Sequence, residues 1–339
     1  MSIRPVRFDI SIVVTLGDAA RDIGMECTMK IGMITDSLGQ MSVEAVVKTS
    51  AELGIEMLEF ACGNWSSAPH VRLDHLLDSE PARREFLARV KDHGIAISAL
   101  NCSGNPLHPG EKGRAHDAIT RKTIRLAGLM GIKRVVMMSG CPGGPGDANP
   151  NWIVTSWPPE CGVILDYQWN QVLIPYWRDL TAYAKSQGVE RICLELHGHQ
   201  AVYSVETLHR LREAVGDTVG ANYDPSHLMW MGADPIAAIR ALGPAIYHVH
   251  AKDTRIDPRN AGINSVLDTK PNDRLAERSW SYVTLGYGHG EGWWRDFCAE
   301  LKRCGYDDVL SIEHEDLLMS PLEGVRKSVR LLREVAVNQ

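Results

Sequence analysis

The feature that most constrains this 339-residue sequence is a regular alternation of short, β-branched or apolar runs with longer amphipathic stretches. The runs cover residues 30–35, 55–60, 95–101, 132–139, 190–197, 218–224, 245–253 and 308–316. Gly54, Gly94, Gly131 and Gly188 each stand just before a run, where glycine supplies the left-handed residue that ends a helix. Strands that alternate with helices predict a parallel sheet, and eight such units predict closure into a TIM (β/α)8 barrel.

An open, doubly wound sheet is the alternative arrangement for such units. Its dinucleotide-binding form carries a Gly-x-Gly-x-x-Gly turn after the first strand, and no such turn follows residues 30–35. We therefore expect one barrel domain over residues 29–339. Residues 1–28 lack the charged start and the small-residue cleavage site of a signal peptide, and we expect them to be a poorly ordered extension.

The charge balance limits the partners of this chain. Asp and Glu number 42 against 36 Lys and Arg, for a formal net charge of -6, which provides no positive field for a nucleic acid backbone. No apolar run reaches the roughly 18 residues of a membrane span. None of the eight cysteines forms a Cys-x-x-Cys pair. We expect buried, reduced thiols in a cytoplasmic protein that binds neither nucleic acid nor a membrane.

Polar side chains stand at the ends of the last four predicted strands: Glu195, Asp224, His250 and Glu313. In a barrel of this type, residues at the carboxyl ends of strands surround the functional face. Because these strands are neighbours, we expect the four side chains to meet on one side of the barrel mouth. Three carboxylates would repel one another strongly without a counter-charge. An oxygen-rich set with one imidazole suits Mn²⁺, or else Mg²⁺ or Co²⁺, with one ion per chain.

A structural role is the alternative for these acids, since each would cap a helix N-terminus or pair with Lys252 or Arg255. That explanation fits a single residue. Three acids and one imidazole on four consecutive strand ends favour a metal centre instead. His248 lies one layer deeper than His250 and is expected to be a core histidine. His314 is expected to point away from the barrel interior.

Other side chains are candidates for catalysis and substrate binding. His197 lies two residues after Glu195 on the same predicted face, and imidazole titrates near neutral pH, so His197 is the first candidate general base. Its alternative role is a hydrogen bond to a metal ligand. His227, just after the sixth strand, is the second candidate. His108 and Lys252 are the candidate substrate-binding groups, with structural roles as the alternative.

These residues resemble the xylose isomerase-like family of sugar phosphate isomerases and epimerases. The resemblance covers residues 30–335, and the family's Glu, Asp, His and Glu metal ligands match the four strand-end residues. The family's Asp-x-x-His turn, in which the histidine contacts substrate, matches Asp224–His227, and its His-x-Lys-Asp stretch matches His250–Asp253. The resemblance implies metal-dependent carbohydrate chemistry without selecting one reaction.

Shorter motifs narrow the resemblance. The segments NPLHP (105–109), ELHGHQ (195–200), VLDTK (266–270), RSW (278–280) and GYGHG (286–290) are similar to a subgroup that contains the catalytic α-subunits of C-glycoside deglycosidases. Those proteins act on 3-oxo-glycosides and pair with a small β-sandwich β-subunit. The resemblance therefore implies a lyase that cleaves a carbon–oxygen or carbon–carbon bond of a sugar or glycoside substrate.

A divalent metal beside a carbonyl and a hydroxyl stabilises the enediolate that forms when an α-proton leaves. We expect this chemistry on a keto-sugar, with elimination from a 3-oxo-glycoside as the favoured outcome. Keto-sugar (phosphate) isomerisation or epimerisation is the alternative, in which the family pattern would make Glu195 and Glu313 the two bases. A noncatalytic sugar-binding barrel is the alternative of another class.

Two long loops, residues 140–166 and 254–289, follow predicted strands and therefore lie on the functional face. The first carries an apolar cluster at Trp152–Pro158. Exposed apolar clusters mark lids or contacts between proteins. We expect this one to contact a β-subunit or a second copy of the chain in an oligomer, with a lid as the alternative.

Overall fold

The computed structural model describes residues 29–336, which form a closed barrel of eight parallel strands. Around the barrel the strands follow the order β1, β10, β7, β6, β5, β4, β3 and β2. They are β1 (Lys30–Ile34), β2 (Met57–Ala61), β3 (Ala96–Asn101), β4 (Arg134–Met137), β5 (Arg191–Glu195), β6 (Val219–Tyr223), β7 (Ile246–Ala251) and β10 (Val309–Ile312). Each overlaps one of the eight predicted runs, so the TIM-barrel prediction is confirmed.

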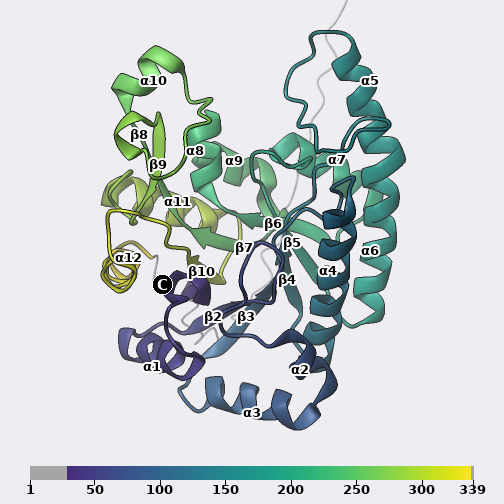
Figure 1. The fold of residues 1–339 in the computed structure, drawn as a ribbon. Helices are drawn as coiled ribbons and strands as arrows, with labels where there is room; N and C mark the ends of the chain where they lie inside the picture. Colours follow the sequence, from purple (N-terminus) through teal and green to yellow (C-terminus); the bar gives the residue numbers. More distant parts are fainter. Residues whose placement is uncertain (1–28, 337–339) are drawn as a thin grey trace, which may run out of the picture.

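Helices surround the barrel on its outside (Figure 1). The longer ones are α1 (Val43–Leu53), α3 (Glu80–Lys91), α4 (Glu111–Met130), α6 (Ile174–Ser186), α7 (Val205–Val215), α11 (Glu291–Arg303) and α12 (Pro321–Val335), and the shorter ones are α2 (Leu73–Asp78), α5 (Glu160–Tyr167), α8 (Pro225–Met231), α9 (Pro235–Leu242) and α10 (Pro258–Asn264). Ser42, Ser79 and Ser204 accept backbone N–H groups at helix starts. Gly54 and Gly131 adopt φ 71° at helix ends, as their positions predicted.

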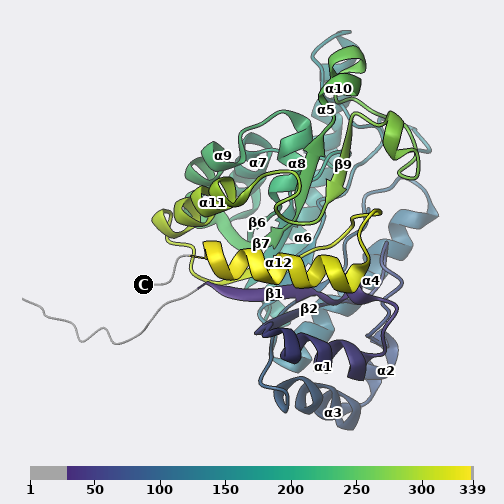
Figure 2. The same ribbon diagram turned by 90° about the vertical axis from the view of Figure 1, so that its left-hand side faces the viewer.

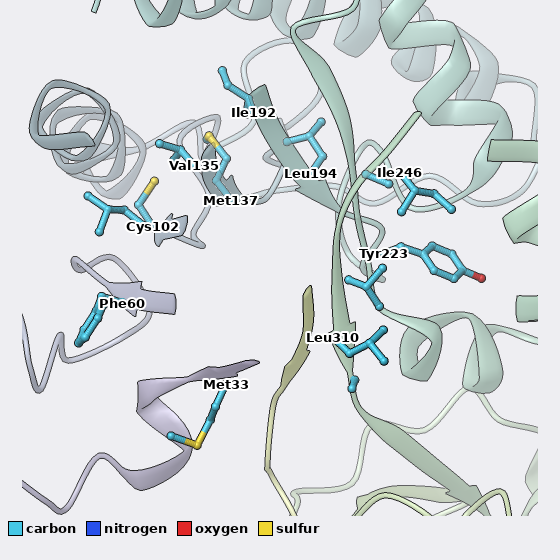
Figure 3. Packing of buried hydrophobic residues seen from close by; sticks show 14 of the residues in the cluster. Met33, Phe60, Cys102, Val135, Met137, Ile192, Leu194, Tyr223, Ile246 and Leu310 are labelled. Carbon is cyan, nitrogen blue, oxygen red and sulfur yellow. The ribbon is translucent and has the colours of Figure 1, made fainter. Parts of the chain in front are cut away.

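Buried side chains lie on both sides of the strands. Outward-facing residues such as Met33, Phe60 and Leu194 belong to the large core cluster between barrel and helices (Figure 3). Figure 2 shows α12 lying along β1, which covers this side of the barrel. A smaller cluster of Ala99, Val136, Cys193 and Tyr247 contains Cys193, which precedes Glu195 by two residues on the same strand. Alternation along a strand therefore turns Cys193 and Glu195 to one face.

The two long loops contain structure of their own. The segment after β4 leads into α5, and the segment after β7 forms an antiparallel pair, β8 (Asp253–Ile256) with β9 (Trp280–Val283), with α10 between them. Figures 1 and 2 place α5 and α10 at the same end of the barrel. The sequence indicated only loops here, because four-residue strands carry too little periodicity to be recognised.

Several smaller expectations concern thiols, histidines and termini. The seven cysteines between residues 29 and 336 are free thiols, and five of them are buried. His314 lies against Gly324 of α12, outside the barrel, as expected. No helix in this part of the chain is long and apolar enough to cross a membrane. The prediction of a poorly ordered extension concerns residues 1–28, outside the described residues.

We expect two leucines of α4 to differ sharply in their contribution to stability. Leu126 is 0% exposed and Leu129 is 47% exposed. Leu126→Ala should lower the free energy of unfolding by about 2–5 kcal/mol, because it leaves a cavity. Leu129→Ala is the matched control in the same helix and should cost less than about 1 kcal/mol. Urea unfolding measures both, and equal losses would contradict this packing.

Candidate metal centre

The four strand-end residues named from the sequence meet at one point of the barrel mouth. Glu195 ends β5, Asp224 follows β6, His250 lies in β7 and Glu313 follows β10. One candidate ligand atom from each lies within 4.8 Å of the others. They converge because β5, β6, β7 and β10 are neighbours in the barrel. The predicted convergence is present, and the chemistry of the donors supports a ligand role, which stays a prediction.

The donor atoms fit a divalent cation. Asp224 Oδ2 and Glu313 Oε2 are buried and accept no hydrogen bond, although a histidine nitrogen lies 3.1 Å from each and Lys252 Nζ lies 3.2 Å from Glu313 Oε2. Burying a carboxylate oxygen without a hydrogen bond is costly, and a cation in the space between the carboxylates would reduce that cost. Carboxylate oxygens with one imidazole suit a hard or borderline divalent ion such as Mn²⁺, Mg²⁺ or Co²⁺.

A further acid, Glu59 of β2, orients the histidine of this set, and the sequence analysis did not identify it. Glu59 Oε2 lies 3.0 Å from His250 Nε2, and its Oε1 accepts a hydrogen bond from Asn101 at 2.7 Å. His250 Nδ1 therefore faces Glu195 and Glu313, whose oxygens lie 3.4 and 3.1 Å away. A carboxylate behind a histidine ligand fixes its tautomer and ring orientation. The available signal was an acid inside the apolar run 55–60.

His248 belongs to the same buried polar network rather than to an apolar core. Its Nδ1 lies 2.8 Å from Asn222 Oδ1, and its Nε2 lies 3.5 Å from Glu59. Burial lowers the pKa of His248 to about 4, so the ring is neutral at pH 7. Burial opposes ionisation of Glu59, but His250 and His248 outweigh it and lower the pKa of that carboxyl to about 2. His248 is buried, as expected of a core histidine, but its ring nitrogens face polar groups that the sequence analysis did not predict.

His227 lies between two of the acids. Its Nε2 is 2.9 Å from Glu195 Oε1 and 3.1 Å from Asp224 Oδ2, and its Nδ1 is 3.0 Å from the Tyr282 hydroxyl. Burial disfavours the charged ring, but the carboxylates of Asp224 and Glu195 outweigh burial and raise the pKa of His227 to about 9. Both nitrogens of the His227 ring thus lie beside polar partners, the two carboxylates at Nε2 and the Tyr282 hydroxyl at Nδ1.

His197 stands beside His227, with ring centroids 4.0 Å apart. Its Nδ1 is 2.5 Å from the Gly198 carbonyl oxygen, so this nitrogen carries the proton and Nε2 keeps a lone pair. Burial and the neighbouring His227 lower the pKa of His197 to about 4. The structure thus brings both candidate bases to the candidate metal centre and leaves a free nitrogen on His197, although the lowered pKa of this ring departs from the near-neutral titration expected from the sequence.

A cavity of about 360 Å³ opens above the centre, and its wall includes Glu195, His197, Lys252, Glu313 and Glu315. Lys252 Nζ lies 3.2 Å from Glu313 and 2.7 Å from Glu315. Burial disfavours the charged amine, but these carboxylates outweigh burial and raise the pKa of Lys252. The cavity therefore presents a cation as well as the candidate base.

His108 is not among the residues that line this cavity. Its Nδ1 accepts a hydrogen bond from the Gly110 N–H at 3.0 Å, so the ring shapes its own loop. The substrate-binding role predicted for His108 stays a prediction without support from this geometry. Lys252, the other candidate, does line the cavity.

The chain matches the family model of the xylose isomerase-like TIM barrel over residues 47–335, and it belongs to this family. More particularly, it is 51% identical over 309 residues to the uncharacterized protein YfiH of Bacillus subtilis (strain 168), covering 90% of this chain and 99% of that protein.

Solved structures show the same fold. The IolI protein with a bound zinc atom aligns with a TM-score of 0.63 at 19% identity, over 91% of this chain and 98% of that one. A D-tagatose 3-epimerase-like protein aligns with a TM-score of 0.61 at 18% identity, also over 91% and 98%. Sugar epimerases are thus among the structural neighbours, while the likeness to C-glycoside deglycosidase α-subunits stays a proposal.

Glu59→Gln should weaken metal binding without unfolding the protein. The amide that replaces the Glu59 carboxylate has no negative charge to hold the proton on His250 Nε2. Removing a carboxylate behind a histidine ligand costs about 10–100-fold in metal affinity. Titration calorimetry with Mn²⁺ measures the dissociation constant. Glu300→Gln is the control, because Glu300 is equally buried but pairs with Arg240 at 2.7 Å and Arg303 at 3.0 Å instead. An unchanged dissociation constant in a folded Glu59→Gln variant would show that Glu59 does not orient the ligand.

Proposed function

We propose that this protein is a divalent metal-dependent enzyme that abstracts a proton beside the carbonyl of a keto-sugar, with cleavage of a 3-oxo-glycoside as the favoured outcome. The observation that carries the proposal is the convergence of four candidate metal donors within 4.8 Å of one another, two of which, Glu195 and Glu313, line a cavity whose wall also includes His197 and Lys252. The chain belongs to the xylose isomerase-like family, and a D-tagatose 3-epimerase-like protein is among its structural neighbours. Both findings support a carbohydrate substrate.

The metal and the protein have separate tasks in this proposal. A divalent ion held by Glu195, Asp224, His250 and Glu313 would polarise the sugar carbonyl and stabilise the negative charge that develops on its oxygen. Lys252 adds a second positive charge at the cavity wall, where it would bind a sugar hydroxyl or the developing oxyanion. Burial of these groups strengthens each electrostatic interaction, because little water screens them.

His197 is the proposed base for geometric reasons. The base must lie beside the metal ligands without being one of them, and it needs an unprotonated nitrogen. The Gly198 carbonyl occupies His197 Nδ1 and leaves Nε2 to take the proton from C2 of the sugar. The C–H electron pair first forms the C2–C3 double bond of the enolate, with the negative charge on the carbonyl oxygen. When the carbonyl re-forms, this pair makes the C1–C2 double bond, and the C1 substituent departs with its bonding pair. His227 stays the second candidate, since both of its nitrogens already have partners.

Isomerisation or epimerisation of a keto-sugar is the second candidate function. Glu195 and Glu313 line the same cavity, and each would exchange a proton with the carbon beside the carbonyl. The 3-epimerase-like structural neighbour favours this alternative. The two functions share the enolate and differ in its fate, because an epimerase returns the proton and a lyase releases a substituent.

Association with a partner is a further part of the proposal. Trp157, on the segment that leads into α5, is 73% exposed, and Val163, within α5, is 69% exposed. Apolar side chains at such exposure support a contact with a small β-sandwich subunit or with a second copy of the chain. Within the predicted cluster, Val154 and Trp157 are exposed whereas Trp152 and Ile153 are half-buried, and association through this cluster stays a prediction.

Removal of the metal should abolish activity. Exhaustive chelation should leave no turnover, and added Mn²⁺ should restore it. Glu313→Gln removes one negative charge from the donor set while nearly preserving its shape, so Mn²⁺ affinity should fall at least about tenfold, or ~1.4 kcal/mol. Calorimetry and circular dichroism measure affinity and fold, with the exposed Glu323→Gln as control. Full activity after chelation would refute the metal centre.

Replacement of the proposed base should slow proton abstraction while leaving metal affinity nearly unchanged. His197→Asn should reduce turnover about 10²–10⁴-fold, the usual contribution of general-base catalysis. The assay incubates Mn²⁺-loaded protein in D₂O with 3-oxo-glycosides and free ketoses, and mass spectrometry identifies the products. Elimination releases the substituent, whereas epimerisation gives a product whose mass differs from that of the substrate only by deuterium.

The exposed His93→Asn variant is the control for this experiment and should keep normal turnover. Normal turnover by His197→Asn would move the role of base to His227 or to the two glutamates. Absence of both deuterium exchange and a primary isotope effect at the carbon beside the carbonyl would rule out the enolate mechanism.

A further inference from the structure

We propose that two tryptophans, Trp152 and Trp230, position the candidate base by clamping the glycine that follows it; this inference rests on the proposed function and specifies how the first long loop regulates the base. Trp152 lies in that loop, residues 140–166, and Trp230 lies near the end of α8. Gly198 directly follows His197 in the segment after β5. We call the two indoles together with Gly198 the indole clamp.

Gly198 acts on His197 through its backbone. His197 Nδ1 lies 2.5 Å from the Gly198 carbonyl oxygen, which keeps the ring proton on this nitrogen and leaves Nε2 free to accept one. The His197 backbone N–H donates to the Glu195 carbonyl oxygen at 3.0 Å, so the turn begins directly at the end of β5. A rotation of the peptide unit after Gly198 would remove the acceptor and allow the other tautomer, in which Nε2 carries the proton. The orientation of one peptide group therefore decides whether the base is competent.

The space beside Gly198 is filled by the two indoles. A β-carbon added to Gly198 would overlap the ring of Trp230 and lie 3.5 Å from Trp152 Cη2. The ring of Trp230 has little freedom to move away, because it stacks on Trp280 with ring centroids 4.9 Å apart and planes 5° apart. Trp152 makes an edge contact with Tyr203, with centroids 5.4 Å apart and planes at 88°. Glycine is thus required at this position by the close approach of the rings.

Two features of the indole clamp lower stability, which favours a functional reason for it. The indole N–H groups of Trp152 and Trp230 are buried without a hydrogen-bond partner among residues 29–336, and an unpaired donor costs free energy. His199, whose ring centroid lies 6.3 Å from that of Trp152, has φ 61°, a left-handed conformation that is uncommon in residues other than glycine. Backbone strain of this kind persists where surrounding contacts enforce it, and it concentrates at functional sites.

Trp152 is the member of the clamp that belongs to a long loop. Gln168 Nε2 donates to the Asn151 carbonyl at 2.6 Å and to the Pro142 carbonyl at 2.9 Å, which holds this part of the loop in place. A displacement of residues 140–166 would withdraw Trp152 and free the turn that carries the base. The position of the loop therefore controls the tautomer of the base.

The tautomer of His197 tests the indole clamp without any substrate. Mg²⁺-loaded protein with ¹⁵N-labelled histidine rings is studied by NMR at pH 7, and the His197→Asn variant identifies the His197 signals. We expect the proton on Nδ1 in the unchanged protein. Gly198→Ala and Trp152→Phe should each give a mixture of the two tautomers, because the added β-carbon displaces the turn and the smaller ring leaves it unsupported.

Two control variants separate the clamp from general effects of substitution. Gly292→Ala adds a β-carbon that meets no atom within 4 Å in the described part of the chain. Trp293→Phe shortens a half-buried indole of α11 that lies against His289, with ring centroids 4.7 Å apart, a contact of the same kind as in the clamp. Both controls should keep the proton on His197 Nδ1.

Turnover is the second readout, and it distinguishes positioning from a loss of structure. Gly198→Ala and Trp152→Phe should lower kcat about tenfold on the 3-oxo-glycoside or ketose that the unchanged protein converts, because a misplacement of about 1 Å can cost about 10²-fold. KM and the Mn²⁺ dissociation constant should change less than about twofold, equivalent to ~0.4 kcal/mol, since neither substitution alters a metal donor.

A proton on His197 Nε2 in the unchanged protein would overturn the proposal. So would variants that keep the Nδ1 tautomer or, on a converted substrate, normal kcat. A fall in kcat with an equal loss of Mn²⁺ affinity would also overturn it, because the substitutions would then act on the whole site. If no substrate is converted but the tautomer depends on Gly198 and Trp152, the proposed function fails while the indole clamp is supported.

Discussion

The concentration of negative charge inside the barrel is the constraint on which the rest of the site depends. Glu59, Glu195 and Asp224 are almost fully buried, and Glu313 adjoins them. Carboxylates lose hydration on burial and repel one another, so they need positive partners close by. The protein supplies histidines and Lys252 on the same side, and the four converging donors leave room for a divalent ion to supply more. The substrate chemistry that we propose at this mouth depends on the positive charge that these acids hold in place.

The sequence predicted the barrel and the four candidate donors because both depend on periodicity along single segments. Helix-ending glycines such as Gly54 mark where strands begin, and a polar residue such as Glu195 at the end of an apolar run marks the functional face. Strand order then determines which ends are neighbours. These inferences need no knowledge of side-chain packing, which explains why Asp224 and Glu313 could be assigned together from residues 89 positions apart.

The residues that were missed make contacts across the barrel that no local pattern records. Glu59 lies in an apolar run and meets His250 only after the barrel closes. Tyr282 lies in a segment without clear periodicity, yet β9 carries it to His227. The role proposed for His108 failed to gain support for a similar reason, since its loop turns the ring toward its own backbone at Gly110.

The contact between Glu59 and His250 also has a consequence for how the polypeptide assembles. All four candidate donors come from the second half of the chain, whereas Glu59 comes from the first half and is synthesised long before its imidazole partner. Until β7 emerges from the ribosome, a collapsed first half would bury an acid with no counter-charge, which disfavours premature compaction. The same pair that orients a ligand therefore makes the two halves of the barrel depend on each other for stability.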